Sequence, residues 1–344
     1  MNSRPNILLL YTGGTIGMIL DKETGVLKPY NFSKLFDYVP TLKLFDYNID
    51  SYSFDPIVDS SNMNPFYWKK IVEVIEQNYE SYDGFVVLHG SDTMAYTASA
   101  LSFMLQNLNK PVILTGSQLP LGMVRSDGRE NFITAVEIAA AKAEDTAVVL
   151  EVCVYFENHL YRGNRTHKSN AENFRAFHSP NYPALAEVGT TIKYNHSAIQ
   201  KPNFKKLKTI KDLDNNIAIL KLFPGINEKT VHSIINIDGL KALILETYGM
   251  GNAPNEEWLI TPLEKAINRG LIVLNVSQCE SGSVKMGKYE TSVRLKEIGV
   301  LSGGDMTTEA AVAKLMYLLG NFDSLAEIKQ YLQKSCVGEI SLSD

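Results

Sequence analysis

Three short segments of the sequence combine glycines with hydroxyl side chains, and each directly follows an apolar run. They are residues 11–17 (Tyr-Thr-Gly-Gly-Thr-Ile-Gly), 89–93 (His-Gly-Ser-Asp-Thr) and 115–118 (Thr-Gly-Ser-Gln). Glycines let backbone amides approach a ligand, and small hydroxyl groups can donate, accept or attack. In open parallel sheets, ligands bind beyond the carboxyl ends of the strands. These segments are therefore the first candidates for a functional site.

Taken singly, each segment also has a purely structural interpretation. Glycine-rich turns between a strand and a helix, capped by threonine or serine, are common in α/β proteins. In the second segment, Ser91 or Asp92 can serve simply as the N-cap of a following helix. The first segment is neither a dinucleotide fingerprint nor a P-loop, because no Lys-Ser or Lys-Thr pair follows its glycines. Nucleotide binding is therefore disfavoured.

Nucleophilic catalysis becomes plausible where a hydroxyl nucleophile, a second hydroxyl, a basic amine and an orienting acid can be brought together. Ser91 and Asp92 supply a hydroxyl and a carboxylate, and Lys168, at the end of the cation-rich stretch 161–168, is the candidate amine. A lysine in water keeps its proton up to about pH 10.4, so a lysine base needs partial burial or a tuned neighbour. The alternative is an ordinary basic surface loop.

Residues 59–63 lie between a strand candidate and a helix candidate. Asp59, Ser60 and Ser61 offer a carboxylate and two hydroxyls, which suit the binding of an α-amino and α-carboxylate pair. The competing interpretation is a simple capped turn.

The elements that must position these residues follow an α/β pattern. Short apolar runs, turns rich in Gly, Ser and Thr, and longer segments with helical spacing alternate, which predicts a parallel sheet with crossover helices. Asn64 is the expected N-cap of one helix, with Pro65 in its first turn. The expected strands are 7–11, 84–88, 112–115 and 147–154, and the expected helices are 65–79, 93–108 and 129–141.

The alternation stops at the lysine-rich, weakly periodic stretch 191–214, which we interpret as a linker. A nucleic-acid patch is less favoured there, because no interleaved aromatic residues form a stacking platform. We expect a larger N-terminal domain at 1–190, with a mainly parallel sheet flanked by helices, and a smaller C-terminal α/β domain at 215–344. The second domain has expected strands at 217–222, 242–245 and 271–276 and expected helices near 256–268, 306–319 and 324–333.

Composition excludes several classes of partner. The 344 residues carry a net charge of −5, so nucleic acid is not an expected main partner. No apolar stretch approaches the roughly 18 to 20 residues that span a bilayer, and no signal-peptide pattern occurs near the start. Three scattered cysteines and six histidines without paired spacing predict neither a disulfide framework nor a metal site, and no cofactor motif occurs. The expectation is a cytoplasmic protein with reduced thiols.

Taken together, these segments resemble the type I L-asparaginases, a family related to the periplasmic type II enzymes. The matching stretches are 11–18, 89–96, 161–165 and 248–254, the last of which is Tyr-Gly-Met-Gly-Asn-Ala-Pro. They occur in the family's order and span both expected domains. The resemblance implies hydrolysis of L-asparagine to L-aspartate and ammonia, without a cofactor.

The resemblance also implies a role for each matched catalytic residue. In that family the second threonine of the Thr-Gly-Gly-Thr motif is the nucleophile, which here is Thr15. Its hydroxyl would attack the side-chain amide carbon and leave a β-aspartyl ester for water to hydrolyse. The family's second hydroxyl, acid and lysine map onto Ser91, Asp92 and Lys168, and Ser91 and Asp92 would also contact the substrate.

By the same resemblance, Asp59, Ser60 and Ser61 would bind the amino-acid group of the substrate. A neighbouring subunit is expected to contribute Asn252. That arrangement would place complete sites at a subunit interface, so a homodimer or homotetramer is expected.

Two departures from the family pattern affect the catalytic groups. The family usually has threonine where this chain has Ser91, which keeps the hydroxyl but loses the β-methyl that restrains χ1. After Gly25, where many relatives place a catalytic tyrosine, this chain has Val26. Tyr30 and Tyr289 are the candidate sources of the phenol, and Tyr289 is favoured because related sequences keep a tyrosine there.

A third departure concerns regulation, because some type I enzymes are activated by asparagine at a separate site in the smaller domain. Ser277, Gln278 and Cys279 resemble part of that effector site. Where an arginine would hold the effector's carboxylate, this chain has Glu246, which would repel it. We therefore expect a hyperbolic dependence of rate on asparagine concentration.

Three rival functions share this sequence pattern. A glutaminase-asparaginase of broader specificity differs only by one methylene of pocket depth, typically worth about 1 to 3 kcal/mol. The amidase subunit of a tRNA-dependent amidotransferase would need an extra N-terminal region and a tRNA surface. A non-catalytic sensor on the same fold would bind asparagine without releasing ammonia.

Overall fold

The computed structural model describes residues 4–20, 27–29, 39–203, 205–287 and 290–341. The chain divides into two compact units, Met1–Lys211 and Asp212–Asp344. Each unit has its own sheet and its own hydrophobic core.

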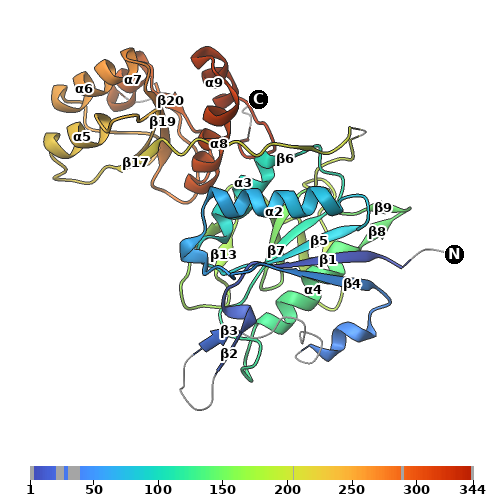
Figure 1. The fold of residues 1–344 in the computed structure, drawn as a ribbon. Helices are drawn as coiled ribbons and strands as arrows, with labels where there is room; N and C mark the ends of the chain where they lie inside the picture. Colours follow the sequence, from blue (N-terminus) through green and yellow to red (C-terminus); the bar gives the residue numbers. More distant parts are fainter. Residues whose placement is uncertain (1–3, 21–26, 30–38, 204, 288–289, 342–344) are drawn as a thin grey trace. The chain divides into compact units, whose positions relative to one another are not determined.

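An eight-stranded sheet forms the centre of the first unit, in the order β15-β14-β11-β10-β7-β5-β1-β4 (Figure 1). The strands β4, β1, β5, β7 and β10 are parallel, and β11, β14 and β15 continue the sheet in antiparallel pairing. Their bounds are β1 (Asn6–Tyr11), β4 (Asn48–Ser53), β5 (Gly84–Leu88), β7 (Val112–Thr115), β10 (Val152–Phe156), β11 (His159–Arg162), β14 (Ala186–Val188) and β15 (Ile192–Tyr194).

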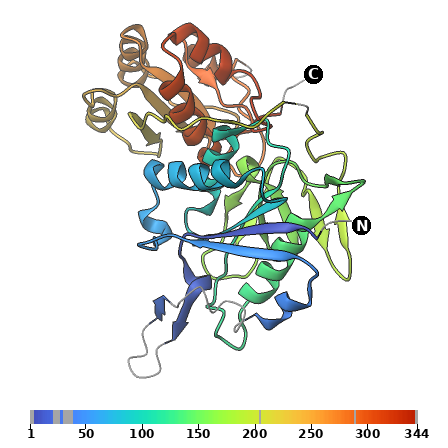
Figure 2. The ribbon, with the colours of Figure 1, turned by 45° about the vertical axis from the view of Figure 1, so that its right-hand side comes forward.

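Helices cover both faces of this sheet. Figures 1 and 2 show α2 (Pro65–Asn78) and α3 (Met94–Met104) over one face and α4 (Gly128–Ala140) over the other. The helix α2 begins as predicted, because the Asn64 side chain accepts a 3.0 Å hydrogen bond from the amide of Phe66 and proline occupies the first turn.

The central strands are buried on both faces, which is why they are continuous apolar runs in the sequence. On the face covered by α4, side chains at alternate positions of β1 and β5, such as Leu9 and Val86, share a core cluster with Phe132 and Val136 of α4. This packing holds β1 and β5 in place, and with them the candidate site segments that follow their carboxyl ends.

Two expected elements differ from the structure. The helix expected over 93–108 ends at Met104, because β6 (Leu105–Gln106) pairs with β16 (Lys208–Thr209). The strand expected over 147–154 begins only at β10. Of its first residues, only Ala147 is in a strand, at the end of a hairpin of β8 (Lys142–Ala143) and β9 (Thr146–Ala147) whose two turn residues, Glu144 and Asp145, both have positive φ.

The remaining short elements of the first unit connect these parts. They are β2 (Met18–Leu20), β3 (Leu27–Pro29), β12 (His167–Lys168), β13 (Phe177–His178), η1 (Thr15–Gly17), η3 (Pro40–Leu44), η4 (Ser60–Asn62) and η5 (Gly163–Arg165). The stretch 191–214, expected as a linker, contains β15 and β16, which pair with strands of the first unit. The expected domain boundaries at 190 and 215 stay predictions.

The second unit is built on a four-stranded, fully parallel sheet in the order β17-β18-β19-β20. Leu243, Leu245 and Val273 of this sheet share a core cluster with Leu259 and Leu263 of α6. The predicted fold class, a larger mainly parallel α/β part and a smaller α/β part, is confirmed. The elements are β17 (Ile217–Lys221), β18 (Ala242–Thr247), β19 (Ile272–Ser277), β20 (Leu301–Ser302), α5 (Glu228–Ile235), α6 (Glu257–Asn268), α7 (Glu290–Glu297), α8 (Thr308–Asn321) and α9 (Leu325–Leu332).

None of the helices in the described ranges is both long enough and apolar enough to cross a membrane.

Candidate active site

The three Gly- and hydroxyl-rich segments emerge from three adjacent parallel strands, with β5 between β1 and β7. Backbone hydrogen bonds join the segments where the strands end. The amide of Thr12 donates to the carbonyl of Leu88 at 3.0 Å, and the amide of His89 donates to the carbonyl of Thr115 at 2.9 Å. The structure therefore brings all three predicted segments to one edge of the sheet.

The backbones of the first two segments touch each other. Gly14 has a φ of 91°, and a Cβ added there would lie 2.5 Å from the Cα of Gly90. A Cβ added at Gly90 would in turn lie 2.5 Å from Ser60 Oγ. Only glycines permit this contact, which joins the loop of Thr15 to the loop of Ser91 and to the 59–61 turn.

Thr15 begins the short helix η1 and is half-buried. The loop that carries it is closed by Tyr11, whose hydroxyl donates a 3.1 Å hydrogen bond to the carbonyl oxygen of Gly17. Burial raises the pKa of Tyr11 to about 12, so this phenol stays protonated and keeps its hydrogen bond near neutral pH.

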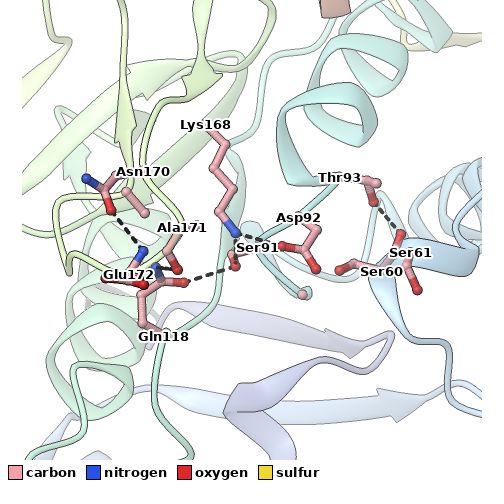
Figure 3. Close-up of polar contacts among 12 residues, drawn as sticks. Ser60, Ser61, Ser91, Asp92, Thr93, Gln118, Lys168, Asn170, Ala171 and Glu172 are labelled. Atoms are coloured by element: carbon pink, nitrogen blue, oxygen red, sulfur yellow. Dashed lines mark hydrogen bonds and ion pairs between the residues drawn. The ribbon is translucent and has the colours of Figure 1, made fainter.

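The side chains of Ser91, Asp92 and Lys168 converge (Figure 3). Lys168 Nζ lies 2.8 Å from Ser91 Oγ and 2.7 Å from Asp92 Oδ1. The Lys168 side chain is 15% exposed, whereas that of Asp92 is 67% exposed, so the amine reaches the carboxylate from the protein side. The predicted hydroxyl, acid and amine are therefore in direct contact.

Most of the stretch 161–168 is not a surface loop. Arg165 and Thr166 are buried, and Arg162 forms a 2.5 Å ion pair with the buried carboxylate of Glu151. These cations hold the segment in the fold, and β12 then pairs with β13. Lys168, at the end of β12, is the cation that extends to Ser91 and Asp92.

The 59–61 segment is a capped turn that also faces the site. Asp59 accepts hydrogen bonds from the Ser61 hydroxyl at 2.7 Å and from the Ser61 amide at 2.8 Å. These hydrogen bonds lower the pKa of Asp59, so its exposed carboxylate is charged at neutral pH. Thr93 Oγ1 donates a 2.6 Å hydrogen bond to the carbonyl of Ser60, which links the turn to the Ser91 loop.

Two contributors were missed in the sequence. His89 has no expected role as the first residue of the 89–93 segment, yet it is fully buried and hydrogen-bonded to Thr97 and Gly90. Gln118 was part of a candidate segment without a role, yet its Oε1 accepts a 3.1 Å hydrogen bond from Ser91 Oγ. The sequence signal for His89 is its position directly after the apolar run 84–88, and that for Gln118 is its position three residues after the run 112–115.

Asn252 lies in a tight turn after β18 in the second unit. Its backbone exchanges two 2.9 Å hydrogen bonds with that of Tyr248, and its Oδ1 accepts from Thr291 Oγ1 at 2.9 Å. The expected role of Asn252 in a neighbouring site stays a prediction. Tyr30, Tyr289 and Val26 lie outside the described residues.

One of the candidate effector residues, Gln278, lies beside Glu246 at the carboxyl end of the second sheet. The Gln278 amide donates to the carbonyl oxygens of Leu222 and Glu246 at 2.7 and 2.9 Å. Thr308 Oγ1 donates to Glu246 Oε1 at 2.7 Å, and Lys221 Nζ lies 3.6 Å from its Oε2. The carboxylate that departs from the family pattern is therefore held by neighbours of its own.

The neighbouring residues Ser277 and Cys279 form a local turn at the end of β19. Ser277 Oγ donates to the carbonyl of Gly249 at 2.7 Å and accepts from the amide of Cys279 at 3.0 Å.

Among the residues that the structure describes, no group of three or more His, Cys, Asp or Glu side chains is arranged to hold a metal ion.

Comparison with known proteins places the chain in a family. The family model described as "Asparaginase, N-terminal" matches residues 6–200, and the "Glutaminase/Asparaginase C-terminal domain" matches residues 216–332. L-asparaginase 1 of Escherichia coli K12 is 41% identical, with 99% of each chain covered. The 60 kDa lysophospholipase of Mus musculus is 39% identical, covering 99% of this chain and 64% of that protein.

Among solved structures, L-asparaginase I of Vibrio cholerae superposes with a TM-score of 0.90 at 41% identity, covering 99% of this chain and all of that one. These matches confirm the predicted resemblance. The chain belongs to the asparaginase family, and its similarity to the type I L-asparaginases extends over its full length.

Proposed function

We propose that this protein is an L-asparaginase that hydrolyses L-asparagine to L-aspartate and ammonia through an ester on Thr15. The observation that carries the proposal is the contact of Lys168 with Ser91 and Asp92. The backbone contact of Gly14 with Gly90 joins the loop of Thr15 to the loop that carries these two residues. The full-length similarity to proteins named L-asparaginase supports it.

In the first half of the proposed reaction, Thr15 Oγ attacks the side-chain amide carbon of asparagine. The threonine hydroxyl gives up its proton, the carbon–nitrogen bond breaks, and the amide nitrogen takes a proton and leaves as ammonia. The product on the protein is a β-aspartyl ester of Thr15. Ser91, Asp92 and Lys168, whose amine donates hydrogen bonds to the other two side chains, are the groups through which these protons pass.

In the second half, water attacks the ester carbon and loses a proton to the same group of side chains. The ester bond breaks, the Thr15 oxygen recovers its proton, and aspartate is released. The hydrogen bonds that Lys168 donates to Ser91 and Asp92 suit this step, because a base must itself be oriented before it can accept a proton from a positioned water.

We assign substrate recognition to the charged and hydroxyl groups of the 59–61 turn together with Ser91 and Asp92. Asp59, whose pKa is lowered by Ser61, offers a carboxylate for the substrate's α-ammonium group. The Ser60 hydroxyl is a donor for the α-carboxylate, and Ser61, whose hydroxyl and amide both donate to Asp59, takes part by holding that carboxylate in place. Asn252 of a second subunit would complete the site, in a homodimer or homotetramer.

A phenol that assists proton transfer is assigned to Tyr289, with Tyr30 as the alternative. The proposal predicts that Tyr289→Phe lowers kcat, whereas unchanged turnover would transfer the role to another tyrosine. The protein is also proposed to act in the cytoplasm, because the relative that it matches over its full length is a type I enzyme.

The test is the initial rate of ammonia release by purified protein over a wide range of L-asparagine concentrations, with L-glutamine in parallel. Thr15→Ala should lower turnover by at least about a thousandfold, because it removes the nucleophile. The matched control is Thr191→Ala, at an exposed threonine, which should leave turnover unchanged. A wild-type protein that binds asparagine without releasing ammonia would contradict the proposal and indicate a sensor.

A further inference from the structure

Ser91 Oγ lies between two side chains that use both sides of its hydroxyl group. It accepts a 2.8 Å hydrogen bond from Lys168 Nζ and donates a 3.1 Å hydrogen bond to Gln118 Oε1. We propose that Gln118 is a positioning residue, which holds the Ser91 hydroxyl in the orientation that presents its oxygen to Lys168. This inference rests on the proposed function, in which Ser91 and Lys168 transfer protons.

The chemistry of its neighbours fixes which way the Gln118 amide points. Its Nε2 donates to the carbonyl oxygen of Ala171 (Figure 3) and to that of Asn173, both at 3.1 Å. Carbonyl oxygens only accept, so the amide NH2 group must face them and Oε1 must face Ser91. These two hydrogen bonds therefore hold Oε1, the acceptor for the Ser91 proton, in place.

The loop that anchors Gln118 is itself ordered. Asn170 Oδ1 accepts hydrogen bonds from the amides of Glu172 and Asn173, both at 2.8 Å, which sets the turn that presents the two carbonyls. This loop follows Lys168 directly in the chain. One segment therefore supplies the donor to Ser91 and also fixes its acceptor.

The backbone of Gln118 is held from the opposite side. Its amide donates to the Asp127 carboxylate at 2.9 Å, just before α4 begins. Gln118 is thus restrained both at its main chain and at the end of its side chain, as a positioning residue must be.

Serine needs such a partner more than threonine does. A serine hydroxyl can occupy three χ1 rotamers of similar energy, because it has no β-methyl to restrict the choice. One hydrogen bond of ordinary strength favours a single rotamer by about fivefold. We expect Gln118→Met, which has nearly the same shape but cannot hydrogen-bond in this way, to lower kcat about fivefold with KM changed by less than about twofold.

The test is a double-mutant cycle of Gln118→Met and Ser91→Thr. In the Ser91→Thr background the β-methyl restrains χ1, so Gln118→Met should lower kcat by less than about twofold. An equal loss in both backgrounds, or a loss confined to KM, would overturn the proposal. Gln77→Met, at an exposed position of α2, is the matched control, and the Tm of every variant checks folding.

Crystal structures of the wild type and of Gln118→Met give a result that does not depend on turnover. The proposal expects one Ser91 rotamer in the wild type and more than one in the variant. The same single rotamer in both would overturn it, even in a protein that releases no ammonia. Absence of ammonia release with the expected rotamers would instead contradict the proposed function alone.

Discussion

The ring Nδ1 of His89 lies 2.6 Å from the carbonyl oxygen of Gly90, the residue before Ser91. A carbonyl only accepts, so Nδ1 carries the proton and Nε2 accepts from Thr97 Oγ1, 2.9 Å away. Thr97 Oγ1 in turn accepts a 2.9 Å hydrogen bond from Trp68 Nε1. A buried chain of hydrogen bonds therefore leads from α2 through α3 to the backbone of the Ser91 loop.

This chain predicts a loss of stability in mild acid. Burial lowers the pKa of His89 from 6.5 to about 4, so the unfolded chain binds a proton that the folded protein excludes. The free energy of unfolding should therefore fall as pH drops from 6.5 to 4, by about 3 kcal/mol from this group. His89→Gln should remove this part of the pH dependence in urea unfolding. His196→Gln, at an exposed histidine, should retain it, and a wild-type curve that is flat in this range would disprove the prediction.

The contact between Gly14 and Gly90 predicts that the site tolerates no side chain there. Gly14→Ala would place Cβ 2.5 Å from the Gly90 backbone and force the Thr15 and Ser91 loops apart. Misplacement of about 1 Å costs about a hundredfold in rate, so kcat/KM should fall at least that much. Gly189→Ala is the matched control, because nothing lies within 4 Å of the added Cβ. Comparable activity of the two variants in an ammonia-release assay would refute the packing argument.

A buried ion pair in the second unit predicts a large effect on stability. Lys314 Nζ and Glu339 Oε1 lie 2.6 Å apart with both side chains fully buried. Lys314→Met leaves a buried carboxylate without its cation, so the free energy of unfolding should drop by about 3 to 5 kcal/mol. Adding Glu339→Gln should recover part of the loss, because the amide oxygen still accepts from the amides of Cys336 and Val337.

The matched control for this ion pair is Lys265→Met, at an exposed position of α6, which should change the free energy of unfolding by less than about 0.5 kcal/mol. Urea unfolding curves of the wild type, Lys314→Met, the double variant with Glu339→Gln, and Lys265→Met give the four free energies of unfolding to compare. If Lys314→Met were no less stable than Lys265→Met, the pair would have no part in holding the C-terminal segment.

The central sheet could be predicted because its strands are buried on both faces and so appear as continuous apolar runs. The antiparallel edge could not be predicted in the same way. The hairpin of β10 and β11 turns at Glu157 and Asn158, which have φ values of 41° and 65° without any glycine to mark them. The short strands β14 and β15 carry too little apolar periodicity to stand out.

The candidate site likewise contains features that the sequence predicts and features that it does not. Ser91 and Lys168 are 77 positions apart, and their contact could be anticipated only from the family resemblance. The contributions of His89 and Gln118 depend on partners such as Thr97 and Ala171, whose proximity is created by the packing of helices and loops. Residue types and spacing alone do not contain that information.

The environment of Glu246 predicts simple kinetics. Glu246 is a carboxylate whose side chain is only 12% exposed, and it accepts a 2.7 Å hydrogen bond from Thr308. The Gln278 amide beside it is already committed to two backbone carbonyls. An amino-acid effector would bring its own carboxylate against this charge, which Lys221, with a side chain 66% exposed and 3.6 Å away, screens only weakly, so binding there is disfavoured. Initial rates against L-asparagine should fit a hyperbola with a Hill coefficient of about 1. A sigmoidal wild-type curve would contradict the prediction. Glu246→Gln, which removes the charge but keeps the shape, tests the cause. If only this variant shows a sigmoidal curve, the Glu246 charge is the reason that the wild type lacks cooperativity.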